Sequence, residues 1–176
     1  MKIIRIGSKL ISVDKIYRAV DKILQLRSSG LSQQEVGERM KVDRAFISRL
    51  ESLGEIRKGK RIAVIGFPIE NKEELEKALA AKGVEYTLIM TDEERWRFVQ
   101  ESNGMELFNS VMEIITDLRN YDVVIVLGSN YRIKLCEALL DKEVIGVEIG
   151  KSPIKGDKYV PVEEIEKLID RVMLDK

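Results

Sequence analysis

Two arginines in one predicted helix, Arg44 and Arg49, are the residues best suited to bind an anionic partner. A guanidinium is always charged, and its N–H groups form a planar fork that pairs well with oxygen acceptors. Helical spacing places Ala45 and Ser48 on the same outward face as the two arginines. The segment could therefore hold a polyanion such as nucleic acid against one side of a helix.

The charges of the chain are divided between its two parts, although the net charge is zero. Residues 1–61 contain 15 Lys and Arg against 7 Asp and Glu, a net charge of +8, and residues 62–176 contain 15 against 23, a net charge of −8. A positive module attracts a polyanion by releasing its condensed counterions, whereas the acidic remainder is repelled. The alternative interpretation is a pair of domains that attract each other.

The basic part is predicted to form three short helices. Apolar residues recur on one face of a first helix, which Gly30 ends. This face consists of Ile16, Val20, Ile23 and Leu24. Ser32 begins the second helix as its N-cap, and Glu35 completes a Ser-x-x-Glu capping box. Residues 2–12 ahead of these helices form either a small hairpin with the two-residue turn Gly7-Ser8 or an extended arm.

The second and third helices are expected to approach each other closely. A turn at Lys41 joins them, and Asp43 caps the third helix, which ends at Gly54. Two helices joined by so short a turn cross at a steep angle, so the fifth position of the first must be small, and Gly37 occupies it. The residues expected to face inward are Val36, Met40, Val42, Ile47 and Leu50.

Residues 31–54, LSQQEVGERMKVDRAFISRLESLG, resemble the helix-turn-helix of the Xre and phage-repressor family. The usual pattern of that family is a capped helix that opens with Gln, a small residue, a tight turn and a recognition helix. The usual turn glycine is replaced here by Lys41, and fewer helices surround the motif than in a complete phage-repressor domain. A lysine in a left-handed turn costs about 1 kcal/mol relative to glycine, but it adds a charge that attracts phosphate.

The resemblance implies roles for individual residues. Gln33 would bind a backbone phosphate at the N-terminus of the first motif helix, helped by the helix dipole. Arg44 and Arg49 would pair with guanine from the recognition helix, Ala45 would touch a thymine methyl group, and Ser48 is a lesser candidate. The implied DNA-contacting residues are Gln33, Lys41, Asp43, Arg44, Ala45, Ser48 and Arg49.

From residue 61 onward the apolar pattern alternates between the periods of strands and helices. The predicted strands are Ile62–Phe67, Val84–Met90, Asp122–Leu127, Glu143–Ile149 and Tyr159–Val162, and the predicted helices are Asn71–Lys82, 92–101, 105–119, 131–141 and a final helix. Such alternation predicts a parallel sheet with a flavodoxin-like strand order, 2-1-3-4-5. The expected fold is thus α/β: a small all-α helix-turn-helix domain, residues 1–60, and a flavodoxin- or Rossmann-like parallel-sheet domain, residues 61–176. The basic stretch 57–61 would be the junction.

Two loops of the predicted sheet domain could bind a ligand where the strand order reverses. Their residues are Gly66, Phe67, Pro68, Gly128, Ser129 and Asn130. They offer backbone amides and small polar groups beside helix N-termini, which suits an anion or a small polar metabolite. Neither loop contains a complete phosphate-binding signature. The alternative is that these residues only turn the chain and cap helices.

Catalytic chemistry is restricted by the residues that the sequence lacks. There is no histidine, a single Cys136 cannot build a thiolate metal site, and there is no Gly-x-Ser-x-Gly element. Leu127-Gly128 stands where a phosphoryl receiver needs Asp. We therefore expect no enzyme activity, no cofactor and no metal.

A further group of apolar residues is expected to form part of the core or a subunit contact. These residues are Trp96, Phe98, Met105, Leu107, Phe108, Val111, Met112 and Ile115.

The sequence leads to one main functional hypothesis and two others. The main one is a homodimeric transcriptional regulator that binds double-stranded DNA, with a parallel-sheet domain that provides dimerisation, an effector site for a small molecule, or both. The lone cysteine, the lack of a secretory signal and the short apolar runs favour a cytoplasmic protein without a membrane span. The second hypothesis is an enzyme that acts on a nucleotide or small metabolite through the α/β domain. The third is a protein that organises DNA without regulating it.

Overall fold

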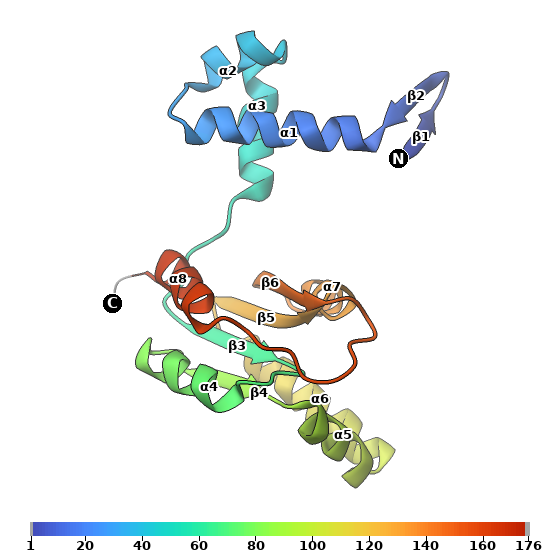
Figure 1. The fold of residues 1–176 in the computed structure, drawn as a ribbon, viewed down its shortest axis with the longest axis vertical. Coiled ribbons are helices and arrows are strands. Elements are labelled where there is room, and N and C mark those ends of the chain that lie inside the picture. Colours follow the sequence, from blue (N-terminus) through green and yellow to red (C-terminus); the bar gives the residue numbers. More distant parts are fainter. Residues whose placement is uncertain (1, 175–176) are drawn as a thin grey trace. The chain divides into compact units, whose positions relative to one another are not determined.

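The computed structural model describes residues 2–174 and divides into two compact units, residues 1–55 and 56–176 (Figure 1). The chain is mixed α/β and contains a parallel sheet, as the sequence predicts, and this sheet has four strands. We call residues 1–55 the helical unit and residues 56–176 the α/β unit. The helical unit has 11 Lys and Arg against 7 Asp and Glu, a net charge of +4, and the α/β unit has 19 against 23, a net charge of −4. None of the described helices is both long and apolar enough to cross a bilayer.

The helical unit contains a hairpin and three helices. Its elements are β1 (Ile3–Ile6), β2 (Lys9–Ser12), α1 (Val13–Ser28), α2 (Gln33–Met40) and α3 (Arg44–Gly54). Of the two alternatives for residues 2–12, the structure has the antiparallel hairpin, and Gly7 takes the positive φ of 58° that suits its two-residue turn. The buried apolar side chains of this unit are Ile23, Val36 and Ile47, one from each helix.

The junction of α2 and α3 follows the expected local chemistry in most respects. The capping box of Ser32 and Glu35 is present, and Lys41 ends α2 in the left-handed conformation with φ 56° and ψ 44°. A Cβ added to Gly37 would lie 2.8 Å from the carbonyl oxygen of Val42, so the position must be glycine. The expectation for Asp43 is confirmed in position only. Asp43 is the N-cap residue of α3, but its side chain accepts no capping hydrogen bond.

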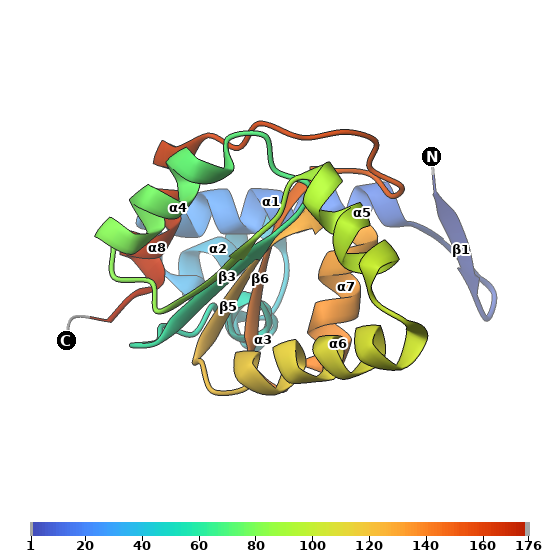
Figure 2. The same ribbon diagram turned by 90° about the horizontal axis from the view of Figure 1, so that it is seen from below.

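The α/β unit is a four-stranded parallel sheet covered by helices on both faces. Its elements are β3 (Ile62–Gly66), α4 (Lys72–Ala81), β4 (Tyr86–Ile89), α5 (Asp92–Glu101), α6 (Gly104–Leu118), β5 (Val123–Ser129), α7 (Asn130–Leu139), β6 (Glu143–Gly150) and α8 (Val162–Val172). The strands lie in the order β4-β3-β5-β6. Helices α4 and α8 pack on one face, and α6 and α7 pack on the other (Figure 2).

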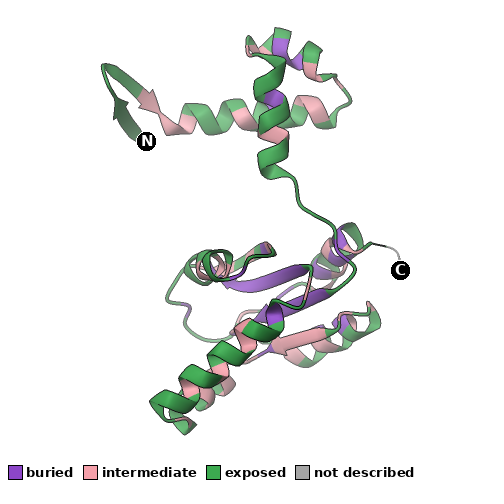
Figure 3. Cartoon of the chain, turned by 180° about the vertical axis from the view of Figure 1, so that it is seen from behind, coloured by how far each residue is buried: buried purple, intermediate pink, exposed green. Residues whose placement is uncertain are grey.

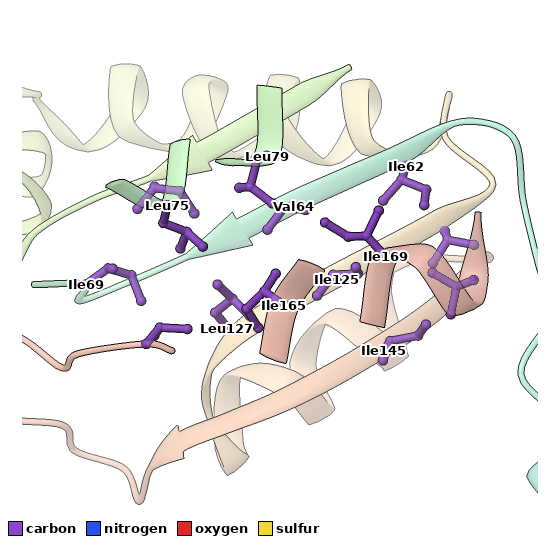
Figure 4. Packing of buried hydrophobic residues seen from close by; sticks show 14 residues of the cluster. Ile62, Val64, Ile69, Leu75, Leu79, Ile125, Leu127, Ile145, Ile165 and Ile169 are labelled. Atoms are coloured by element: carbon purple, nitrogen blue, oxygen red, sulfur yellow. The ribbon is translucent and has the colours of Figure 1, made fainter. Parts of the chain in front are cut away.

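The two central strands are buried along their whole length, which explains why their sequences do not alternate between apolar and polar residues (Figure 3). On the first face, Val64 of β3 and Leu127 of β5 pack with Leu79 of α4 and Ile165 of α8 in one apolar cluster (Figure 4). On the second face, Val124 and Val126 pack with residues of α6 and α7. This double cover holds the carboxyl ends of the strands in place.

The expected fifth strand at 159–162 is absent, so the prediction of a five-stranded sheet is wrong. Val162 begins α8, and Pro161 is its N-cap, where a residue without an N–H group is well tolerated. The amide of Asn71 takes the place of a strand partner for Val160: its nitrogen donates to the Val160 carbonyl at 2.8 Å, and its oxygen accepts from the Val160 N–H at 2.9 Å. Lys158 forms an isolated parallel bridge with Ile69.

The basic stretch 57–61 is attached to the α/β unit. Gly59 forms a parallel bridge with Met173, and the backbone amides of Lys60 and Arg61 both donate to one carboxylate oxygen of Asp122, at 2.9 and 3.0 Å. The Arg61 side chain forms an ion pair with Glu85 at 3.0 Å. The side chains at 57, 58 and 60 are exposed.

We expect Gly37→Ala to destabilise the helical unit by about 1–3 kcal/mol, because the new methyl group overlaps the Val42 carbonyl. Hydrogen exchange of peptides from α2 and α3 in the full chain measures this loss locally. Gly54→Ala is the matched control, because a Cβ at the end of α3 would meet no atom within 4 Å. That control should be neutral or stabilising by up to about 1 kcal/mol. Equal exchange in both variants would contradict the close approach.

Candidate functional site

The exposed face of α3 is the main candidate site. Arg44, Ala45, Ser48 and Arg49 are all exposed, whereas Ile47 on the opposite face is fully buried. The structure therefore brings together four of the residues that sequence analysis selected. Arg44 is the first residue of α3, where the helix dipole adds positive potential to that of the guanidinium.

Gln33 at the start of α2 connects this face to the interior of the helical unit. Its amide nitrogen donates to Oε2 of Glu51 at 2.7 Å, and its amide oxygen accepts from Nε of Arg44 at 3.4 Å. Both polar ends of the amide are thus engaged, which fixes the orientation of the side chain. A side-chain hydrogen bond thus joins Gln33, the first residue of α2, to Arg44, the first residue of α3.

Arg27 of α1 holds the other oxygen of the same carboxylate. Its Nε forms an ion pair with Oε1 of Glu51, and its guanidinium also donates to the carbonyl oxygen of Leu31. One carboxylate near the end of α3 therefore links α1, α2 and α3. Sequence analysis missed both Arg27 and Glu51. The sequence does offer one indication of their position. Arg27 directly follows Leu26 and Glu51 directly follows Leu50, and both leucines pack against the core of the helical unit.

The hydrogen bonds from Arg27 and Gln33 lower the pKa of Glu51 below its ordinary value of 4.5. Glu35 in the capping box also has a lowered pKa, because the backbone and hydroxyl of Ser32 donate to its carboxylate. Both groups are therefore negative at neutral pH. They leave the arginines of α3 as the charges directed outward.

The turn between α2 and α3 lies beside this face. Lys41 and Asp43 are both exposed, and together with Arg44 they border an open surface hollow of about 350 Å³. Asp43 brings a negative charge next to Arg44. This makes the edge of the site near Arg44 mixed in charge. Arg49 lies five residues further along α3, about one and a half helical turns away.

The six residues proposed for ligand binding also lie close together, at the carboxyl ends of β3 and β5. The amide of Phe67 donates to the Leu127 carbonyl at 3.1 Å, so the two loops are adjacent. Pro68 and Ser129 are buried, Phe67 is partly buried, and Asn130 is exposed. Gly66, the last residue of β3, and Gly128, the next-to-last residue of β5, are both buried.

Each loop makes contacts that serve the fold. The Ser129 hydroxyl accepts from the Arg132 amide and caps α7, and Oδ1 of Asn130 accepts from the Ser152 amide at 3.2 Å. The segment 151–161 crosses this edge of the sheet, and the Lys158 amide donates to the Pro68 carbonyl at 3.1 Å. These contacts are of the turning and capping kind. Ligand binding at these residues stays a prediction.

Helix α6 carries an apolar surface that the α/β unit does not cover. Met105 is 69% exposed and Phe108 is 61% exposed, whereas Leu118 on the inner face is buried. Trp96 of α5 is also about half exposed, at 52%. The expectation for this group was core or a subunit contact, and these three residues do not lie in the core.

The chain matches no family model, no curated protein and no solved structure. The resemblance of residues 31–54 to the Xre and phage-repressor helix-turn-helix therefore depends on the motif and its geometry alone.

We expect the contribution of Glu51 to stability to depend on pH. Its pKa is lower in the folded chain than in the unfolded chain, so the carboxylate stabilises the fold above about pH 4.5 and this effect is lost as the pH falls through the folded pKa. Urea denaturation of the full chain should therefore show that Glu51→Gln lowers stability at pH 7, and that the difference from wild type shrinks below pH 4.5. Glu55→Gln removes the same charge at the exposed C-cap of α3 and should change little. A difference that is equal at both pH values would refute the role of the ionised carboxylate.

Proposed function

We propose that this protein is a sequence-specific, DNA-binding transcriptional regulator that acts as a homodimer. In this proposal α2 and α3 form a helix-turn-helix of the Xre type, and α3 is the recognition helix. The observation that carries the proposal is the exposed α3 face with its two outward guanidinium groups, positioned by a packed and hydrogen-bonded inner face. An arginine pair of this kind suits the major groove, which is wide enough to admit a helix.

Phosphate contacts would position the protein on the duplex. Gln33 begins α2, so a phosphate near it would also meet the free amides at the positive end of the helix. The hydrogen bond between Gln33 and Arg44 would align the phosphate contact with the first base contact. Lys41 in the exposed turn would add a second phosphate contact.

Base contacts would provide specificity. Arg44 and Arg49 would each donate two hydrogen bonds to a guanine, and Ala45 would touch a thymine methyl group. Two copies of α3 would read half-sites one duplex turn apart, about 34–36 Å. The α/β unit would carry an effector site or a dimer contact. An effector bound there would change the affinity of the two recognition helices for DNA.

The arginines can be tested after an operator has been selected from a pool of random duplexes. Arg49→Ala should relax the preference at one base pair and weaken binding to the selected site by about 1–3 kcal/mol, roughly 5- to 150-fold. Fluorescence anisotropy over a range of salt concentrations measures both effects. Arg18→Ala, which removes an exposed arginine from α1, is the matched control and should keep the base preference. If no duplex is enriched, or if Arg44→Ala with Arg49→Ala binds as wild type does, the proposal fails.

Lys41→Gly should change stability and DNA binding in opposite directions. Glycine has no steric cost at the left-handed turn, so the helical unit should gain up to about 1 kcal/mol of stability. The loss of one phosphate contact should reduce the magnitude of the salt slope by about 0.9 and weaken binding to all duplexes alike. Lys41→Arg keeps the charge and should keep the slope. A Lys41→Gly variant with an unchanged slope would remove Lys41 from the phosphate-contacting residues.

A further inference from the structure

The hairpin β1–β2 stands apart from the rest of the helical unit. It lies beyond the N-terminal end of α1, away from α2 and α3, in both views (Figures 1 and 2). Within residues 2–174, β1 and β2 pair only with each other. The hairpin has large aliphatic side chains in spite of this position. Their exposed fractions are 49% for Ile3, 40% for Ile4, 61% for Ile6 and 74% for Leu10.

The register of the hairpin places apolar residues on both of its faces. Ile4 pairs with Ile11 and shares a face with Ile6, whereas Ile3 and Leu10 lie on the opposite face. A single two-stranded hairpin is at best marginally stable in water, and it needs further strands or a packed face to persist. Within the described residues of the helical unit, this hairpin therefore lacks the cover that its side chains require.

Both edges of the hairpin also have free hydrogen-bonding groups. The Val13 amide donates to the Lys2 carbonyl at 2.9 Å, so these residues form a hydrogen-bonded pair at the base of the ladder. Hydrogen-bonded and non-hydrogen-bonded pairs alternate in an antiparallel ladder, which makes Arg5 opposite Leu10 a non-hydrogen-bonded pair. Their backbone groups point outward. Open edges of this kind are templates for another strand.

The first turns of α1 extend the apolar surface. Ile16 is 49% exposed and Tyr17 is 63% exposed, and both lie within about two helical turns of the end of β2. With the four hairpin residues they expose on the order of 500 Å² of apolar surface, which matches the apolar share of a standard interface of about 800 Å² per partner. A partner that covers both faces of the hairpin and the start of α1 would therefore bury an area of this standard size.

We propose that the hairpin β1–β2, with the adjoining turn of α1, is the surface where a second copy of this chain binds. Two identical open edges can pair about a twofold axis, so that each supplies the hydrogen bonds and apolar cover that the other lacks. This inference assigns an interface to the homodimer of the proposed function. It rests on the proposed function only for the statement that the protein acts as two copies. Aliphatic side chains at this density favour a protein partner over DNA, although Arg5 and Lys9 are basic.

Sedimentation velocity of the full chain without DNA tests the proposal. Wild type should be a dimer, and Ile6→Lys with Leu10→Lys should raise the dissociation constant of the dimer by at least about 100-fold, because two aliphatic side chains lose their burial. The matched control is Met105→Lys with Phe108→Lys on α6, which has similar exposed fractions. This control should leave the dimer intact. A monomeric wild type, or a dimer broken by the α6 pair and not by the hairpin pair, would overturn the inference.

A second variant separates assembly from folding. Arg5→Pro removes an outward amide and should leave the internal ladder of the hairpin in place, yet it should block pairing at the β1 edge and weaken the dimer. None of these positions belongs to the buried core of Ile23, Val36 and Ile47, so hydrogen exchange in α2 and α3 should match wild type. If the dissociation constant of the dimer is unchanged in both hairpin variants, the hairpin edge is not the dimer interface.

Binding to the selected operator distinguishes this inference from the proposed function. Monomeric hairpin variants should bind more weakly and keep the base preference that Arg44 and Arg49 determine. Hairpin variants that stay dimeric but lose affinity would assign the hairpin to DNA instead and overturn the inference. A wild-type dimer that breaks as described but binds no duplex would support the inference and reject only the proposed function.

Discussion

The close approach of α2 to the turn before α3 is the constraint on which the helical unit depends. Only a glycine at position 37 leaves room for the Val42 carbonyl, and the same contact brings Ile47 into a core whose fully buried apolar side chains are Ile23, Val36 and Ile47. Within residues 2–174, five partly buried apolar residues surround this small core, and polar contacts add to their packing. The polar link through Glu51 supplies a further constraint on α3, because it attaches α3 to both other helices.

The α/β unit solves the same problem with a larger core. Its sheet is buried on both faces, and its helices are placed by many apolar contacts. Polar groups at the carboxyl ends of the strands are therefore available for local tasks. The Asn71 amide, for instance, satisfies both backbone groups of Val160 and replaces an edge strand with one side chain.

Sequence reasoning succeeded where a local rule determines the structure. The capping box at Ser32, the small residue at Gly37 and the buried strands each follow from a few neighbouring residues. It failed where the outcome depends on a distant partner. The stretch 159–162 has the composition of a strand, but Asn71, 89 residues away, takes the pairing groups of Val160. Glu51 was missed for the same reason, since its partners come from two other helices.

The way that Asp122 holds the segment 57–61 has a consequence for the electrostatics of the α/β unit. Without this segment the rest of the unit has a net charge of −8, and the segment adds four positive charges at one place on its surface. A unit charged in this asymmetric way experiences a torque near a long, negatively charged polymer. It would turn the segment 57–61 toward the polymer and its acidic surface toward solvent before any short-range contact formed.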